Sequence, residues 1–138
     1  MTQQESNKTI IQNSIETVWN QQNLAALSDY WNANCINHAM PGEHKTGLEM
    51  LHAYHAGFLE ALQGVEARIE ILQQIAEADR VVTHLSTHAT HKTTFMGMPP
   101  TGKTVTLSTI RIDRLENGKI SEHWSVADMA GLMQQLQG

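Results

Sequence analysis

The hydrophobic pattern changes its period near Gly64, and this change limits the possible folds more than any other feature of the chain. Before Gly64, which is typical of a helix end, apolar residues recur at helical spacing. After it, apolar and polar residues alternate as they do in a half-buried β-strand. Helices followed by a run of strands predict an α+β fold, with the helices packed on one face of the sheet.

Three helices are expected in the first half. Residues 7–21 carry an apolar stripe at helical spacing. A short second helix would take Asn23 as its N-cap and include Trp31. Thr46 and Glu49 form the T-x-x-E pattern of a capping box, which predicts the start of the third helix.

The second half predicts a meander of antiparallel strands. Residues 65–71 alternate in polarity, and residues 80–91 are β-branched and rich in histidine. Residues 103–126 read as two strands joined at Asn117–Gly118, a strong hairpin signal. Residues 129–137 predict a short helix or a turn. With 138 residues, the chain is expected to form a single domain over 1–138.

The register of the last hairpin decides which side chains face the core, because a slip of one residue exchanges the two faces. A two-residue turn pairs Arg111 with Trp124 and Asp113 with Glu122. A bulged three-residue turn pairs Ile110 with Trp124 instead. Both turns accept Asn-Gly, so the register stays open. In either case Glu122 and Trp124 share a face, and we expect that face to line a pocket.

Composition and charge exclude several functions. The net charge is −5 and no stretch is densely basic, so no nucleic-acid partner is expected. No apolar run is long enough to span a membrane. The polar start, MTQQESNKTI, lacks the blocks of a signal peptide, which favours a cytoplasmic location. Cys35 is the single cysteine, so no internal disulfide can form.

Residues 97–104, GMPPTGKT, match the P-loop pattern letter for letter. That pattern binds phosphate only where a helix follows, because the helix N-terminus holds the anion. Here a strand pattern follows, and Pro99 and Pro100 lack the N–H groups that a cradle needs. We therefore expect a loop between two strands and no bound nucleotide.

Eight histidines raise the possibility of a metal site. Glu49, His52 and His55 lie three residues apart on the expected third helix. A di-iron site of this kind requires a second Glu-x-x-His copy, which is absent from the sequence. A closed zinc site usually has four ligands, often including several cysteines, and Cys35 has no second cysteine to accompany it. We expect no metal.

Four segments resemble the SnoaL-like polyketide cyclases of the NTF2-like superfamily. In chain order they are IETVWNQQN, INHAMPG, FMGMPPTGKTVTL and ENGKISEHWSVADMAGLMQQL, which together span nearly the whole chain. The resemblance implies a cone in which three N-terminal helices pack on a strongly curved antiparallel sheet and enclose a mostly apolar pocket. It also implies a homodimer. Relatives on this fold cyclise, isomerise, hydrate epoxides or only bind ligands, so the fold alone does not define the function.

Asp128 is the first candidate for an acid/base group. It stands ten residues after Gly118, the spacing of the catalytic aspartate in related epoxide hydrolases, and the cyclases place an acid/base aspartate in this neighbourhood. Partial burial at a pocket mouth would raise its pKa toward working pH. Asp128 also precedes the expected C-terminal helix, so N-capping is an equal alternative.

The other catalytic candidates are Glu122, as a helper of Asp128, and His38, near which the epoxide-hydrolysing relatives place a polar group that holds water. The candidate residues of the ligand pocket are Trp19, Tyr54, Phe58, His91, Met96, Arg111 and Trp124.

The resemblance implies a cofactor-free enzyme that cyclises or isomerises a small apolar carbonyl compound by acid/base chemistry. The alternative is a non-catalytic module that binds a small ligand, and Arg111 favours it because many family members carry an acidic residue there. Epoxide hydration is not expected. Those relatives need an Arg-x-Asp where this chain has Leu85 and Thr87.

Overall fold

A computed structural model describes residues 1–40, 45–61, 67–94 and 97–137. The α-helices are α1 (Gln3–Ser14), α2 (Leu27–Tyr30), α3 (Leu48–Ala61) and α4 (Met129–Gln137). A π-helical stretch, η1 (Ile15–Asn20), extends α1, and a 3₁₀ turn, η2 (Leu24–Ala26), precedes α2. The strands are β1 (Trp31–Asn37), β2 (Arg68–Glu77), β3 (Arg80–Thr90), β4 (Thr104–Glu116) and β5 (Lys119–Ala127).

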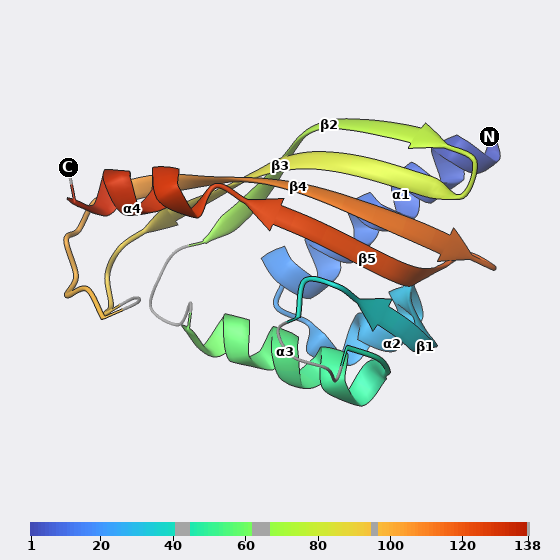
Figure 1. The fold of residues 1–138 in the computed structure, drawn as a ribbon, viewed down its shortest axis with the longest axis horizontal. Helices are drawn as coiled ribbons and strands as arrows, with labels where there is room; N and C mark the ends of the chain where they lie inside the picture. The colour runs from blue at the N-terminus through green and yellow to red at the C-terminus, as the bar shows by residue number, and fades with distance from the viewer. Residues whose placement is uncertain (41–44, 62–66, 95–96, 138) are drawn as a thin grey trace.

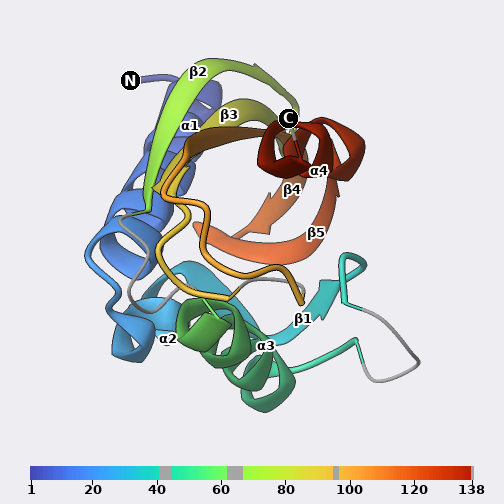
Figure 2. The same cartoon turned by 90° about the vertical axis from the view of Figure 1, so that its left-hand side faces the viewer.

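The strands form one curved sheet in the order β1-β5-β4-β3-β2. The first three helices cover its concave side, and α4 lies beside β4 and β5 at one end (Figure 1). In the perpendicular view the sheet is strongly curled, and α3 lies opposite its concave face (Figure 2). The α+β class that the sequence predicts is therefore confirmed.

Two local expectations need correction. The sheet is mixed, because β1 runs parallel to β5 while the other pairs are antiparallel. Trp31 begins β1 and does not lie in a helix. The inward positions of this strand include Asn37, and a polar residue at such a position hides the alternation by which strands are recognised.

The capping box forms at a different helix from the expected one. Thr2 Oγ1 accepts from the Glu5 amide and Glu5 Oε2 accepts from the Thr2 amide, both at 3.1 Å, at the start of α1. Thr46 instead forms a β-bridge with Ile36. Its extended backbone places it in the sheet, so α3 begins after Gly47. The expected end of that helix at Gly64 lies outside the described residues.

The β4–β5 hairpin takes a register that neither sequence alternative contained. Its turn residues, Asn117 and Gly118, have φ angles of 53° and 78°, as a two-residue type I′ turn requires. A bulge follows at Ser121, after which Asp113 pairs with His123. The turn is thus of the two-residue type, and the extra residue lies further along the strand.

This bulge reverses the side-chain alternation of β5. Ile120 and Ser121 are both buried, and from there on the odd-numbered positions face the helices. His123 therefore points inward together with Arg111, whereas Glu122 and Trp124 lie on the outer face of the sheet. The shared face expected for Glu122 and Trp124 exists, but it is the face turned away from the helices.

The main core lies between the helical segments α1, η1, α2 and α3 on one side and the inner face of the sheet, including β1, on the other. A second cluster joins α4 to the sheet through Val105, Leu132 and Leu136. Among the described residues, no helix is both long enough and apolar enough to cross a membrane. The P-loop-like segment leads directly into β4 and not into a helix.

Candidate functional site

A cavity of about 870 Å³ lies inside the cone, a volume within the usual range for small-molecule sites. Its wall is formed by η1, α3, α4 and the inner face of the sheet. Most of this wall is apolar, and it includes Trp19, Trp31, Leu85, Val105, Leu107 and Leu132. Polar side chains gather on its β1–β5–β4 side.

The centre of this polar group is Asp113, whose side chain is fully buried. Arg111 donates to it from Nε at 2.8 Å and from Nη2 at 2.9 Å. His123 Nδ1 lies 2.7 Å from Asp113 Oδ1. Burial alone would raise the pKa of Asp113, but attraction to Arg111 and His123 prevails and lowers this pKa to about 2. Asp113 is therefore a carboxylate at any physiological pH.

His123 is held as a neutral base. Burial lowers its pKa more than the adjacent Asp113 raises it. Because a carboxylate can only accept, Nδ1 carries the ring hydrogen and Nε2 keeps a lone pair. The imidazole also meets Trp31 edge-on, with ring centroids 5.5 Å apart. A carboxylate that orients an imidazole in this way is the usual arrangement of an acid/base histidine.

His55 is a second neutral imidazole in the wall. Its Nδ1 donates to the Leu51 carbonyl at 3.0 Å, which leaves Nε2 as an acceptor. Burial lowers the pKa of His55 to about 4. Its ring lies 4.7 Å from that of Trp19 and 6.0 Å from that of Trp31, measured between centroids.

Two side chains supply hydrogen-bond donors to the same part of the cavity. Asn37 Oδ1 accepts from the Ala39 amide at 2.9 Å, and its Nδ2 hydrogens bond to none of the described residues. Arg111 uses Nε and one Nη2 hydrogen on Asp113, and Nη1 bonds to none of the described residues. These donors can stabilise an oxygen that gains negative charge.

Four of the residues that the sequence suggested for a ligand pocket line this cavity: Trp19, Tyr54, His91 and Arg111. Met96 and the side chain of Phe58 lie outside the described part of the chain. Their roles, like those of the other candidates, remain predictions.

Asp128 lies outside the cavity wall, exposed at the start of α4. Its Oδ1 accepts from the Gly131 amide at 2.9 Å, which is the geometry of an N-cap. Gly131 permits this contact, because a Cβ there would occupy the space of the Asp128 carboxylate. The capping alternative drawn from the sequence is therefore realised.

Glu122, His38 and Trp124 form a network on the outer face of the sheet. His38 Nε2 lies 2.7 Å from Glu122 Oε2, and the His38 ring stacks on Trp124 with centroids 4.9 Å apart. Arg114 Nε donates to the other oxygen of Glu122 at 3.1 Å. Glu122 and Trp124 differ from their expected position because the Ser121 bulge turns them outward.

Sequence reasoning missed Asn37, His55, Asp113 and His123 as members of the site. For Asn37 and His55 a signal existed: Asn37 immediately precedes His38, and His55 follows Tyr54 on α3. For His123 the inward orientation depends on the bulge in β5, which has no sequence signature. Asp113 shares the face of Arg111 on β4, which one of the two register alternatives turned toward the pocket. No three His, Cys, Asp or Glu side chains within the described ranges are grouped as a metal ion would require.

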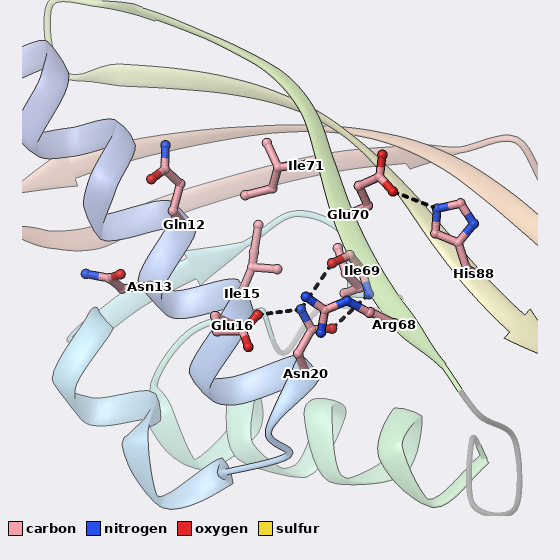
Figure 3. A pocket seen from close by; sticks show the side chains of 10 residues that line it. All are labelled: Gln12, Asn13, Ile15, Glu16, Asn20, Arg68, Ile69, Glu70, Ile71 and His88. Carbon is pink, nitrogen blue, oxygen red and sulfur yellow. Dashed lines mark hydrogen bonds and ion pairs between the residues drawn. The ribbon is translucent and has the colours of Figure 1, made fainter.

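A second hollow, of about 450 Å³, lies between α1–η1 and β2 (Figure 3). Half of its lining residues are solvent-exposed, and among them only Ile15 is buried. At its edge, the side-chain amide of Asn20 accepts from the Ile69 amide at 2.8 Å and donates to the Ile69 carbonyl at 3.1 Å. We regard the larger cavity as the candidate site, because it holds the buried acid/base group.

A cone of helices on a curved sheet, with an apolar cavity and a buried polar end, defines a protein of the NTF2-like class. Within this class, the chain belongs to the SnoaL-like polyketide cyclase family, whose model matches residues 9–136. The resemblance drawn from four sequence segments is thereby confirmed.

Individual proteins are similar to this chain in sequence or in fold. Nogalonic acid methyl ester cyclase of Streptomyces nogalater is 26% identical over 108 residues, which are 78% of this chain and 77% of the relative. A candidate polyketide cyclase from Acidithiobacillus ferrooxidans superimposes with a TM-score of 0.85 at 24% identity, covering 99% of this chain and 98% of the other. AclR, a candidate hydroxylase from Streptomyces galilaeus, superimposes with a TM-score of 0.80 at 27% identity. The match covers 97% of this chain and 82% of AclR.

Proposed function

We propose that this protein is a cofactor-free acid/base enzyme that cyclises or isomerises a small, largely apolar carbonyl compound. One observation carries the proposal: a buried Arg111–Asp113–His123 group opens into a mostly apolar cavity. The cyclase activity named for the Streptomyces nogalater relative supports the same reaction class.

In the proposed reaction, Arg111 and Asn37 donate hydrogen bonds to the substrate carbonyl oxygen. His123 Nε2 takes a proton from the adjacent carbon, and the electron pair of the broken C–H bond forms an enolate. The two donors stabilise the oxygen as it gains charge, and Asp113 stabilises the imidazolium. No other group is needed to balance this step.

The enolate then has two outcomes. In a cyclisation, its carbon attacks a second carbonyl of the same molecule, and the resulting alkoxide takes the proton back from His123. In an isomerisation of a β,γ-unsaturated ketone, the enolate is a conjugated dienolate, and its γ-carbon receives that proton. Both outcomes return His123 to its neutral form.

Exchange of α-hydrogens tests this proposal without knowledge of the natural substrate. A small apolar ketone such as 2-tetralone is incubated with the protein in D₂O, and deuterium uptake is followed by NMR. We expect His123→Gln to slow uptake at least ~100-fold, the usual contribution of a positioned acid/base group. Asp128→Asn retains a good N-cap and is expected to leave the rate unchanged.

The same pair of variants tests the role that the sequence predicts for Asp128. Loss of exchange in Asp128→Asn, with His123→Gln unaffected, would move the acid/base function to Asp128. Binding of ketones with no catalysed exchange in the wild-type protein would favour the alternative, a small-ligand-binding module without turnover.

We also propose a homodimer formed through the outer face of the sheet. Register partners place Ile75, Val82, Ile112 and Trp124 in one row across four strands. Ile75 is 63% exposed, and Val126 in the neighbouring row is 79% exposed. An apolar row of this length on a sheet face favours a protein partner, and a second copy is what the family resemblance implies. A cytoplasmic location remains our expectation.

A further inference from the structure

His91 lies at the end of the cavity away from His123. It follows β3 directly, and its backbone is fixed by a bond from its amide to the Lys103 carbonyl at 2.8 Å and one from the Gly102 amide to its carbonyl at 2.9 Å. The residue is only 3% exposed and belongs to the cavity wall. Its side chain is therefore held in place by the loop that connects β3 to β4.

The hydrogen bonds around His91 define its tautomer. The Thr101 amide points at Nδ1 from 3.3 Å, and the Thr101 hydroxyl lies 3.0 Å from the same nitrogen. That hydroxyl accepts from the Lys103 amide at 3.2 Å, so its own hydrogen is available to Nδ1. Nδ1 thus acts as an acceptor, and the hydrogen of the neutral ring is on Nε2.

Nε2 of His91 is a buried donor that finds no acceptor on any residue the structure describes. Buried donors are nearly always paired, because an N–H removed from water without a partner destabilises the fold. Neither the strands nor the P-loop-like segment explains this N–H group. A ligand in the adjoining cavity can supply the acceptor.

The two polar ends of the cavity are separated by a largely apolar stretch of β4. Lys103, which bonds to His91, and Arg111 are eight residues apart, about 26 Å in a straight strand and less in a curved one. Between them, Val105 and Leu107 face the cavity, followed by Thr109 next to Arg111. A ligand that reaches both ends therefore needs a largely apolar middle.

We infer that the substrate carries two oxygen acceptors at opposite ends of an apolar body, and that His91 Nε2–H binds the one that does not react. The inference rests on the proposed function for the assignment of the reacting end to Arg111 and His123. It narrows the substrate class to elongated ketones with a distal carbonyl, ester or ether oxygen.

Two series of linear probes test this assignment. One series consists of methyl ketones, and the other of ω-oxo methyl esters of matched length. Binding is measured by quenching of tryptophan fluorescence. At one chain length we expect the ester to bind about tenfold more tightly than its ketone, the usual gain from one hydrogen bond.

Variants identify the group responsible for the gain. In His91→Phe the tenfold preference should disappear, while ketone affinity stays within about twofold. His84→Phe is the matched control, because His84 lies on the outer face of the sheet and bonds to Ser108; it should retain the preference. A preference that persists in His91→Phe, or its absence at every length in the wild type, overturns the inference.

A measurement on the wild-type protein avoids any folding defect of the variant. With ¹⁵N-labelled histidine, the ester should shift the Nε2–H resonance of His91 and the matched ketone should not; equal shifts count against the inference. If the wild-type protein prefers the esters but does not catalyse α-hydrogen exchange, the proposed chemistry is refuted and the role of His91 is not. If it catalyses exchange but shows no preference for the esters, only the role of His91 is refuted.

Discussion

Asp113 accepts three hydrogen bonds, two from Arg111 and one from His123, at a position without solvent contact. An arrangement of this kind is sensitive to the loss of any one partner, because the remaining charges stay buried. The sequence alone identified Arg111 as a pocket residue but gave Asp113 no role. The sequence shows which residues carry charged or titratable side chains. The contact between His123 and Asp113, however, depends on the β4–β5 register, which the sequence left open.

Asp113→Asn should therefore be strongly destabilising. We expect a loss of roughly 3–5 kcal/mol in the free energy of unfolding at pH 7, because Arg111 would remain buried without its counter-ion. The measurement is urea denaturation followed by circular dichroism. The double variant Arg111→Met, Asp113→Leu should regain most of the loss, and a double variant less stable than Asp113→Asn would contradict this explanation.

The same carboxylate predicts how stability depends on acid. Its pKa is 3.8 for an ordinary aspartate and about 2 here, so the unfolded chain binds its proton first as pH falls. Its stabilising contribution is complete above about pH 4 and is lost as pH falls through about 2. His55 adds a loss at higher pH, between its ordinary pKa of 6.5 and about 4, because only the unfolded imidazole is protonated there.

At the scale of elements, the sequence predicted helix α1, helix α3, strands β2 to β5 and the 117–118 turn from periodicity and turn chemistry. It missed β1, where the buried side of the strand carries Asn37. It also missed the bulge at Ser121, which has no sequence signature. A single extra residue in β5 thus decided which half of the side chains of that strand enters the cavity.

The N-cap of α4 gives a prediction at this scale. Asp128→Ala removes the acceptor for the Gly131 amide and should lower the free energy of unfolding by about 1 kcal/mol. Asp128→Asn should cost clearly less, since asparagine caps equally well. Thermal denaturation of the two variants checks the difference. Equal losses in both would mean that the negative charge matters more than the cap.

For the whole molecule, the α+β class followed from the order of helices and strands, because few arrangements can bury both sets of apolar faces. The cone and its enclosed cavity were implied by the resemblance to the SnoaL-like family. The outer face of the sheet was less predictable. Its apolar row lies across β2, β3, β4 and β5 and emerges only when their registers are known.

That row leads to a prediction about assembly. Val126→Asp should convert a dimer into a monomer, because it places a charge on the proposed interface, and light scattering after size-exclusion chromatography measures the change. Val126 is 79% exposed in the single chain, so the monomer itself should stay folded. Glu49→Lys, an exposed change on α3 and therefore on the helical side of the sheet, serves as the control. A wild-type protein that is monomeric at high concentration would contradict the proposed interface.

The contact between Asn20 and Ile69, seen at the edge of the second hollow (Figure 3), has a consequence for how chains meet one another. The outer edge of β2 is an edge of the sheet, and an open edge is a template on which strands of other molecules can add and aggregate. The Asn20 amide occupies both backbone groups of Ile69, as a neighbouring strand would. One side chain from the first helical segment therefore blocks edge-to-edge growth of the sheet at this point.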